Sequence, residues 1–171
     1  MIKLQFEKLS EAHAIEVMDI FNDYAENSFA AYPEHRLPYE FFPKFLESSE
    51  GYPAYAIKVE NTAKVIGFCL LRPYNPFPVF RQTAEVSYFI DRNYVGKGIG
   101  RAALDLLEHD AKAMGIHHLL ANISSRNEGS LCFHRRNGFI ECGRLKNIGK
   151  KHGSLFDVIW MIKSLSQDEA V

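Results

Sequence analysis

The segment NYVGKGIGRAAL, residues 93–104, changes abruptly from chain-breaking residues to helix-forming ones. Glycine lacks a side chain, so the backbone in the first half of this segment can approach a ligand closely and adopt conformations that other residues avoid. The first N–H groups of the following helix have no partner within the helix and lie at the positive end of its dipole. With Lys97 and Arg101 beside them, these groups predict an anion site, most naturally for a phosphate-bearing ligand.

Two common phosphate-binding motifs do not fit this segment. A P-loop requires Ser or Thr directly after its lysine, whereas Gly98 follows Lys97. The dinucleotide-binding pattern G-x-G-x-x-G requires a third glycine at position 101 or 103, where the chain has Arg101 and Ala103. A tight turn that only packs a helix against a strand therefore stays open as an alternative reading of the glycines.

The rest of the chain shows strand and helix patterns in irregular alternation. Short β-rich runs bounded by turn residues predict strands, and apolar residues that recur every three or four positions predict helices. Strands are expected over 2–8, 51–60, 64–74, 83–91, 116–124, 139–149 and 153–165; helices are expected from Ser10 to about Ala25, over 39–48 with Pro43 interrupting or starting it, over 98–114 and over 127–138. Because this order lacks regular βαβ alternation, it predicts a mixed α/β (α+β) structure with few parallel crossovers.

Composition narrows the class of protein. The 171 residues are 47% hydrophobic and 24% charged, which is typical of a globular protein, and we expect one domain over residues 1–171. A net charge of -1 gives no general reason to expect a nucleic-acid or membrane partner, and no run approaches the ~20 apolar residues of a spanning helix. The three cysteines, Cys69, Cys132 and Cys142, have unrelated spacings, which favours free thiols in the cytoplasm and no metal site.

Several motifs in the chain resemble those of the GNAT N-acetyltransferases. Residues 95–100 resemble their [RQ]-x-x-G-x-[GA] signature, with Val95 in place of Arg or Gln. Three more segments resemble the subgroup of phosphinothricin and methionine sulfoximine/sulfone acetyltransferases: FRQTAEVSYFID (80–91) is similar to F-R-x-T-x-E-x-S-x-Y-V, NEGSLCFHRRNGF (127–139) to N-x-x-S-x-x-x-H-x-x-x-G-F, and NIGKKHGSLFDV (147–158) to V-G-x-K-x-G-x-W-x-D-V, with Leu155 at the Trp position. Ordered motifs at fitting distances are more specific than the glycines alone.

This resemblance implies a fold and a co-substrate. The GNAT fold is a twisted, mostly antiparallel sheet of six to seven strands flanked by helices, with strands four and five splayed apart. The co-substrate is acetyl-CoA, and the implied cofactor-binding residues are Tyr88, Phe89, Ile90, Val95, Gly96, Lys97, Gly98, Ile99, Gly100, Arg101, Asn127 and Ser130. For the last two residues, a helix-capping role is compatible with contact to the pantetheine arm. A homodimer is implied in the same way, with 147–157 and the last strands at its interface.

Two residues are candidates for the chemistry of acetyl transfer. An alkylammonium has a pKa near ~10, so at neutral pH it must lose a proton to a base before it attacks the thioester. Glu85 matches the glutamate that the family uses as this base, and the alternative is an exposed carboxylate on a strand. His134 stands where many GNAT enzymes have a tyrosine as general acid towards the CoA sulfur, and the alternative is a packed histidine that shapes the CoA channel.

The acceptor is less well defined by the sequence. By resemblance, the aromatic-rich loop after the first helix faces the thioester. The candidates to line the substrate pocket are Tyr24, Asn27, Phe29, Tyr32 and Phe80. A substrate carboxylate would be received by Arg72, Arg81, Lys151 or His152, although each of these also reads as a surface cation. The resemblance implies direct transfer of acetyl to the amine of a small amino acid or analogue of the phosphinothricin or methionine sulfoximine kind. The alternatives are transfer to a protein N-terminus, a lysine or a polyamine, and a non-catalytic acyl-CoA-binding module.

Overall fold

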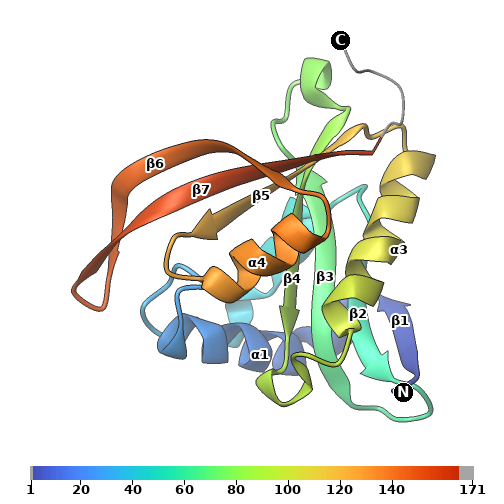
Figure 1. Cartoon of the computed structure of the whole chain (residues 1–171). Helices are drawn as coiled ribbons and strands as arrows, with labels where there is room; N and C mark the ends of the chain where they lie inside the picture. The colour runs from blue at the N-terminus through green and yellow to red at the C-terminus, as the bar shows by residue number, and fades with distance from the viewer. Residues whose placement is uncertain (1, 166–171) are drawn as a thin grey trace.

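Seven strands form one sheet in the computed structural model, which describes residues 2–165 (Figure 1). They are β1 (Leu4–Lys8), β2 (Ala54–Val59), β3 (Val65–Pro73), β4 (Thr83–Ile90), β5 (His118–Ser124), β6 (Ile140–Lys151) and β7 (Ser154–Ser164). Their order across the sheet is β1-β2-β3-β4-β5-β7-β6, and only the pairing of β4 with β5 is parallel. The predicted mixed, mostly antiparallel fold is confirmed.

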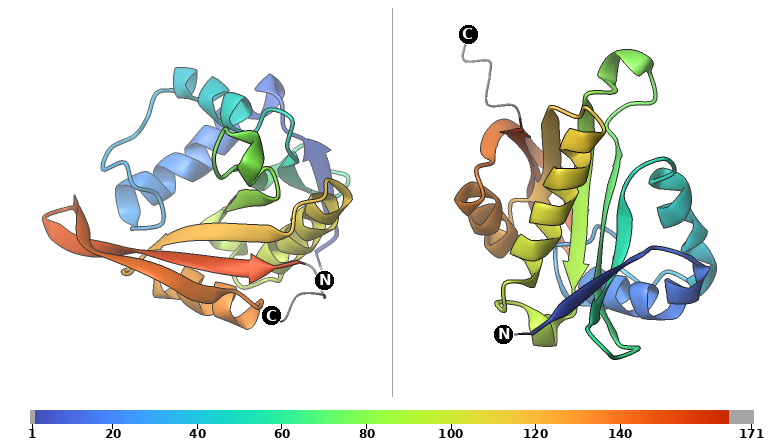
Figure 2. Two further views of the ribbon diagram at one scale, coloured as in Figure 1. Left: turned by 90° about the horizontal axis from the view of Figure 1, so that it is seen from above. Right: turned by 90° about the vertical axis from the view of Figure 1, so that its right-hand side faces the viewer.

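Helices cover both faces of this sheet (Figure 2). One face carries α1 (Ala14–Asn27) and α2 (Pro43–Ser48), and the other carries α3 (Ile99–Ala113) and α4 (Glu128–Arg136). Pro43 starts α2 rather than interrupting a longer helix, because the first helical position does not need an N–H donor. Short 3-10 turns complete the chain: η1 (Glu11–His13), η2 (Tyr39–Phe41), η3 (Pro78–Phe80) and η4 (Arg92–Tyr94). Among the described residues, no helix is long and apolar enough to span a membrane.

Alternation along the strands divides the interior into two cores. In β4, Val86 and Ile90 pack in the core beneath α3, whereas Phe89 packs with Phe21 of α1 on the opposite face. Successive side chains of a strand point to opposite faces, so one strand contributes to both layers. The same alternation places the side chains of Glu85 and Tyr88, three positions apart, on opposite faces of the sheet.

The parallel pair β4–β5 separates partway along its length. Pairing covers only Thr83–Glu85 of β4 with His118–Leu120 of β5, although both strands continue beyond it. Beyond this point each strand keeps its other neighbour: β4 stays paired with β3, and β5 with β7. This is the expected splay between strands four and five, and it leaves an opening through the middle of the sheet.

Candidate active site

A cavity of about 1060 Å³ occupies the opening between β4 and β5. Its wall includes residues of α1, the 30–33 loop and α2 on one face of the sheet, and the glycine turn and α4 on the other. The second halves of β4 and β5 complete it between the two faces. The cavity therefore passes through the sheet, so that two ligands entering from opposite faces can meet within it.

The glycine turn forms one end of this cavity. Asp91 opens η4 by accepting a hydrogen bond from the N–H of Asn93 at 2.9 Å, and the chain then turns through Gly96 and Gly98. These two glycines have φ values of +80° and +82°, in the left-handed region that other residues rarely adopt. Gly98 is the N-cap of α3 and has no side chain to satisfy the first N–H groups of the helix. Those groups are therefore available to a ligand.

The donors at this turn fit a diphosphate. Val95, Gly96, Gly98, Gly100 and Arg101 all line the cavity. The Arg101 guanidinium is paired with Asp105 at 2.6 Å and donates to Asn137, so it adds positive charge beside the turn. A helix N-terminus flanked by such donors is suited to phosphate oxygens.

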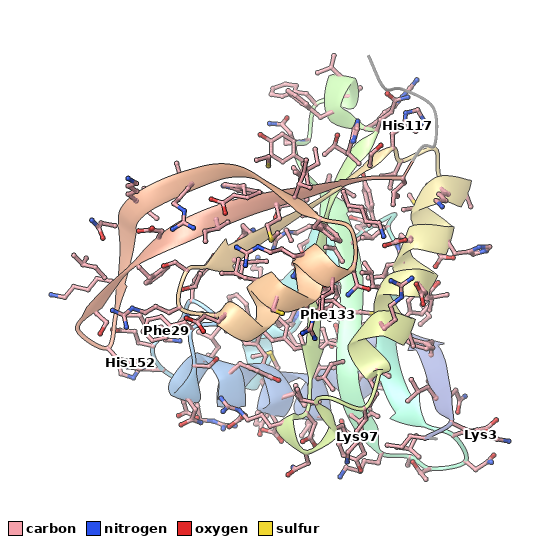
Figure 3. The ribbon with its side chains drawn as sticks, in the orientation of Figure 1. Lys3, Phe29, Lys97, His117, Phe133 and His152 are labelled. Carbon is pink, nitrogen blue, oxygen red and sulfur yellow. The ribbon has the colours of Figure 1, made fainter. Side chains whose placement is uncertain are left out.

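Two predicted members of the glycine segment lie outside the cavity wall. Ile99 is buried in the core beneath α3. Lys97 lies on the turn at the base of α3, with Nζ donating to the carbonyl of Asn93 at 2.7 Å (Figure 3). Lys97 is exposed, so it adds to the local positive charge without forming the surface of the cavity in this conformation.

Strand β4 offers unpaired backbone groups to the same cavity. Asp91 donates its N–H to Ile66 of β3 at 2.8 Å, and by alternation Phe89 also directs its peptide groups towards β3. The peptide groups of Tyr88 consequently point into the opening, where β5 has moved away. The carbonyl of Ile90 faces the same way and accepts the Tyr24 hydroxyl at 2.6 Å. Because the Ile90 carbonyl is already bonded, the peptide groups of Tyr88 are the strand-edge groups that suit the amides of a pantetheine arm.

Helix α4 closes the cavity on the side of the glycine turn. Asn127 caps the helix by accepting a hydrogen bond from the N–H of Ser130 at 3.2 Å. Both residues also line the cavity, together with Phe133 and His134 one turn further along. The capping role expected from the sequence is therefore compatible with contact to a ligand.

His134 is buried in α4 and is held at both ring nitrogens. Nδ1 lies 2.7 Å from the carbonyl oxygen of Ser130, which can only accept, so Nδ1 carries the proton. Nε2 is then the acceptor for the hydroxyl of Tyr88. Burial lowers the pKa of His134 and raises that of Tyr88 well above its usual value, so both groups are neutral at pH 7.

Glu85 lies on the opposite face of the sheet, in a network of polar side chains. Its Oε2 atom accepts hydrogen bonds from Arg72 Nη2 at 2.6 Å and Nε at 3.1 Å, and from Asn122 Nδ2 at 3.2 Å. Asn122 Oδ1 in turn accepts the Tyr32 hydroxyl at 2.9 Å. Arg72, Asn122 and Tyr32 line the cavity, whereas Glu85 lies behind them with 12% of its side chain exposed.

The predicted acceptor residues are distributed over different parts of the structure. Tyr24 lines the large cavity, and Phe29 lines a smaller cavity of about 400 Å³ beside it. Phe29 also packs edge-on against His152 at the tip of the β6–β7 hairpin (Figure 3). Phe80 lies in η3 against Tyr74, with a ring separation of 5.6 Å, and is not part of either wall.

Lys151 is a structural cation rather than a receiver of substrate. Its side chain is buried, and Nζ donates to the carbonyls of Ala25, Ser28 and Ala31 at 2.6, 2.6 and 2.7 Å. An ammonium has three donors, so all of them are used. Lys151 thereby ties the β6–β7 hairpin to the end of α1 and to the loop that carries Tyr32.

Sequence reasoning missed Asn122 and the partnership of Tyr88 with His134. Asn122 is the polar residue inside the otherwise apolar run 119–123, LLANI, which is a recognisable signal of a functional position. Tyr88 occupies a position that the F-R-x-T-x-E-x-S-x-Y-V pattern leaves open, so the motif contains no signal for it.

The separated strand pair lies beside a glycine-lined helix N-terminus. This arrangement suits an enzyme that transfers a group from a phosphate-bearing carrier. Residues 15–139 match the Acetyltransferase (GNAT) family. The chain therefore belongs to this family, whose enzymes use acetyl-CoA.

Individual relatives agree with this membership. The chain is 30% identical to an L-methionine sulfoximine/L-methionine sulfone acetyltransferase of Pseudomonas aeruginosa, over 85% of both chains. It is 32% identical to an L-amino acid N-acyltransferase of Escherichia coli, over 68% of this chain and 67% of the relative. Among solved structures, a phosphinothricin acetyltransferase from Sinorhizobium meliloti in complex with AcCoA superimposes with a TM-score of 0.88 at 26% identity, over 98% of this chain and 91% of the other.

Proposed function

We propose that this protein transfers acetyl directly from acetyl-CoA to the amine of a small amino acid or analogue, with Glu85 as the general base. The observation that carries this proposal is the placement of the Glu85 network at the opening between β4 and β5, opposite the glycine turn. The relatives that act on methionine sulfoximine, methionine sulfone and L-amino acids support the substrate class.

Different residues around the opening have different roles in the reaction. The turn at Gly96–Gly100 and Arg101 bind the diphosphate, and the free peptide groups of β4 align the pantetheine arm. Acetyl-CoA supplies the activated acyl group as a thioester. Glu85 accepts the proton of the substrate ammonium, directly or through one water, and an N–H of β4 stabilises charge on the thioester oxygen.

For His134, the geometry favours a positioning role over proton donation. A general acid must carry a proton directed at the leaving sulfur. Here Nδ1 donates to Ser130, while Nε2 accepts from Tyr88 and has no proton to give. We propose that His134 fixes the hydroxyl and ring of Tyr88 beside the pantetheine arm, and that solvent protonates the thiolate.

The test is a thiol-release assay with acetyl-CoA and a panel of amines: free amino acids, methionine sulfoximine, methionine sulfone, phosphinothricin, a peptide N-terminus and a polyamine. Glu85→Gln should lower kcat/KM at least about 100-fold, while acetyl-CoA still raises the melting temperature of the variant. Exposed Glu50→Gln is the matched control. Full turnover by Glu85→Gln would remove Glu85 as the base. Release only with peptides or polyamines would change the acceptor, and no release with any amine would favour an acyl-CoA-binding module.

We also infer a cytoplasmic homodimer. The three cysteines, of which Cys132 and Cys142 are exposed, are free, as suits a reducing compartment. Exposed apolar side chains gather on the β6–β7 hairpin, namely Ile140, Leu145, Ile148 and Leu155. Apolar groups on one element favour burial against a second copy. A mass from light scattering equal to one chain would contradict the dimer.

A further inference from the structure

We propose that Arg72 is the anchor for the carboxylate of the substrate, and that the same guanidinium holds and screens Glu85 until an amino acid enters. This inference rests on the proposed function, and it narrows the acceptor to molecules that carry an anionic group next to the amine. A simple amine would then be a poor substrate.

The first observation is the direct pairing of Arg72 with the candidate base. The two residues are register partners on adjacent strands, β3 and β4, and their side chains leave the same face of the sheet. Both recorded donors of Arg72 bind the same carboxylate oxygen, Oε2 of Glu85. A guanidinium has five N–H groups, so three remain for a ligand. Within residues 2–165, no other acceptor is recorded for Arg72.

The second observation is the order of the two side chains from the cavity inwards. Arg72 is 40% exposed and forms part of the cavity wall, whereas Glu85 is 12% exposed and does not. An entering molecule therefore meets the cation before it meets the carboxylate. A substrate ammonium that binds the Oε2 atom of Glu85 displaces the guanidinium, because both Arg72 hydrogen bonds end on this atom.

The charge pattern of an α-amino acid matches this arrangement. Its carboxylate and ammonium are attached to one carbon, just as Arg72 and Glu85 are in direct contact. When the substrate carboxylate binds Arg72 through two parallel hydrogen bonds, the ammonium is brought next to Glu85. The ion pair of the free enzyme is thus replaced by two ion pairs with the substrate, and no charge is left without a partner.

Asn122 keeps Glu85 in place during this exchange. Its amide donates to the same Oε2 atom at 3.2 Å, and its own oxygen is fixed by the Tyr32 hydroxyl at 2.9 Å. Burial raises the pKa of Tyr32 to about 12, so it stays a neutral donor at working pH. Glu85 therefore retains one hydrogen bond when Arg72 moves to the substrate. An amine without a carboxylate gains no such help, because at Oε2 it competes with Arg72 and has no anionic group to draw the guanidinium away.

The experiment compares methionine sulfone with 3-(methylsulfonyl)propylamine, which is the same molecule without its carboxylate. The variants are Arg72→Gln and Arg72→Lys, with exposed Arg136→Gln as the matched control. In Arg72→Gln, the KM for methionine sulfone should rise roughly 10- to 100-fold, the loss expected for charge-assisted hydrogen bonds. The kcat/KM for the simple amine should change much less than that for methionine sulfone, because the simple amine has no carboxylate that Arg72 could bind. The KM of Arg72→Lys for methionine sulfone should lie between those of the wild type and Arg72→Gln, because lysine keeps the charge but loses the planar two-donor geometry of the guanidinium.

Two results would overturn the inference. One is an equal decrease in kcat/KM for both substrates in Arg72→Gln, which would mean that Arg72 only positions Glu85. The other is a wild-type enzyme that acetylates both compounds equally well.

A thermal-shift titration with methionine sulfone in the presence of CoA tests the anchor without turnover. Stabilisation of the wild type that is lost in Arg72→Gln supports the anchor even if no thiol is released, in which case only the proposed function fails. Stabilisation that persists in Arg72→Gln contradicts it, and so does the absence of stabilisation and turnover in the wild type.

Discussion

The Tyr88 hydroxyl is hydrogen-bonded to Nε2 of His134, joining β4 to α4 on the face of the sheet opposite Glu85. The two rings also stack, with an interplanar angle of 17° and a centroid separation of 5.5 Å. Two polar groups only three positions apart in one strand thus lie on opposite sides of the cavity. Tyr88 belongs to the side of the glycine turn, and Glu85 to the side of α1.

Burial of His134 predicts a pH-dependent stability. Because its pKa in the folded protein lies below the ordinary value of 6.5, the unfolded chain takes up a proton first as pH falls. The contribution is fully present above about pH 6.5 and is lost as pH falls towards the folded pKa. Urea unfolding at pH 7.5, 6.5 and 5.5 should show that the free energy of unfolding decreases less in His134→Gln than in the wild type as the pH falls. An equal dependence of the free energy of unfolding on pH in the two proteins would contradict this.

Removal of the Tyr88 hydroxyl leaves a buried acceptor without its partner. We expect Tyr88→Phe to lower the free energy of unfolding by about 1–2 kcal/mol, because Nε2 of His134 then has no donor. The KM for acetyl-CoA should rise as well, since the ring loses its fixed position. Tyr52→Phe is the control, since no partner of its hydroxyl is recorded between residues 2 and 165. The prediction fails if both variants are equally stable.

The buried ammonium of Lys151 predicts that Lys151 contributes much more to the free energy of unfolding than its neighbour Lys150. Lys151→Met should cost about 2–4 kcal/mol of unfolding free energy, because three carbonyls lose a charged donor and one of them belongs to the last turn of α1. Lys150→Met, at an exposed position of the same strand, should change stability by less than about 0.5 kcal/mol. Chemical denaturation of both variants measures the difference. Equal denaturation midpoints would show that the three hydrogen bonds of Lys151 Nζ contribute nothing to stability.

Substitution of alanine for Gly98 and for Gly129 should have different effects on stability. Gly98→Ala places a side chain at φ +82°, which costs about 1–2 kcal/mol even though a Cβ there meets open space. We expect lower stability and a higher KM for acetyl-CoA. Gly129 lies within α4 at ordinary helical φ, so Gly129→Ala should be neutral or stabilise by up to about 1 kcal/mol. Unfolding curves together with acetyl-CoA titrations of both variants check this, and a stabilised Gly98→Ala would refute it.

Much of the architecture could be predicted from local patterns. The order of strands and helices follows from hydrophobic periodicity, and the glycine turn before α3 was evident from residues 96–100 alone. The splay of β4 from β5 came only from the family resemblance, because neither strand contains a residue that forbids further pairing. The extent of α2 was uncertain at Pro43, since proline both ends and begins helices.

The sequence by itself determined the fold class, the glycine turn before α3 and the family, because these depend on residues close together in the chain. Only the tertiary structure decided that Arg72 covers Glu85, that Tyr88 meets His134 across 46 positions, and that Lys151 is buried rather than exposed. Those contacts depend on strand register and on how α4 and the β6–β7 hairpin pack. No local pattern encodes such distances, so an arginine or lysine in sequence is equally compatible with a surface cation, a substrate anchor or a structural clamp.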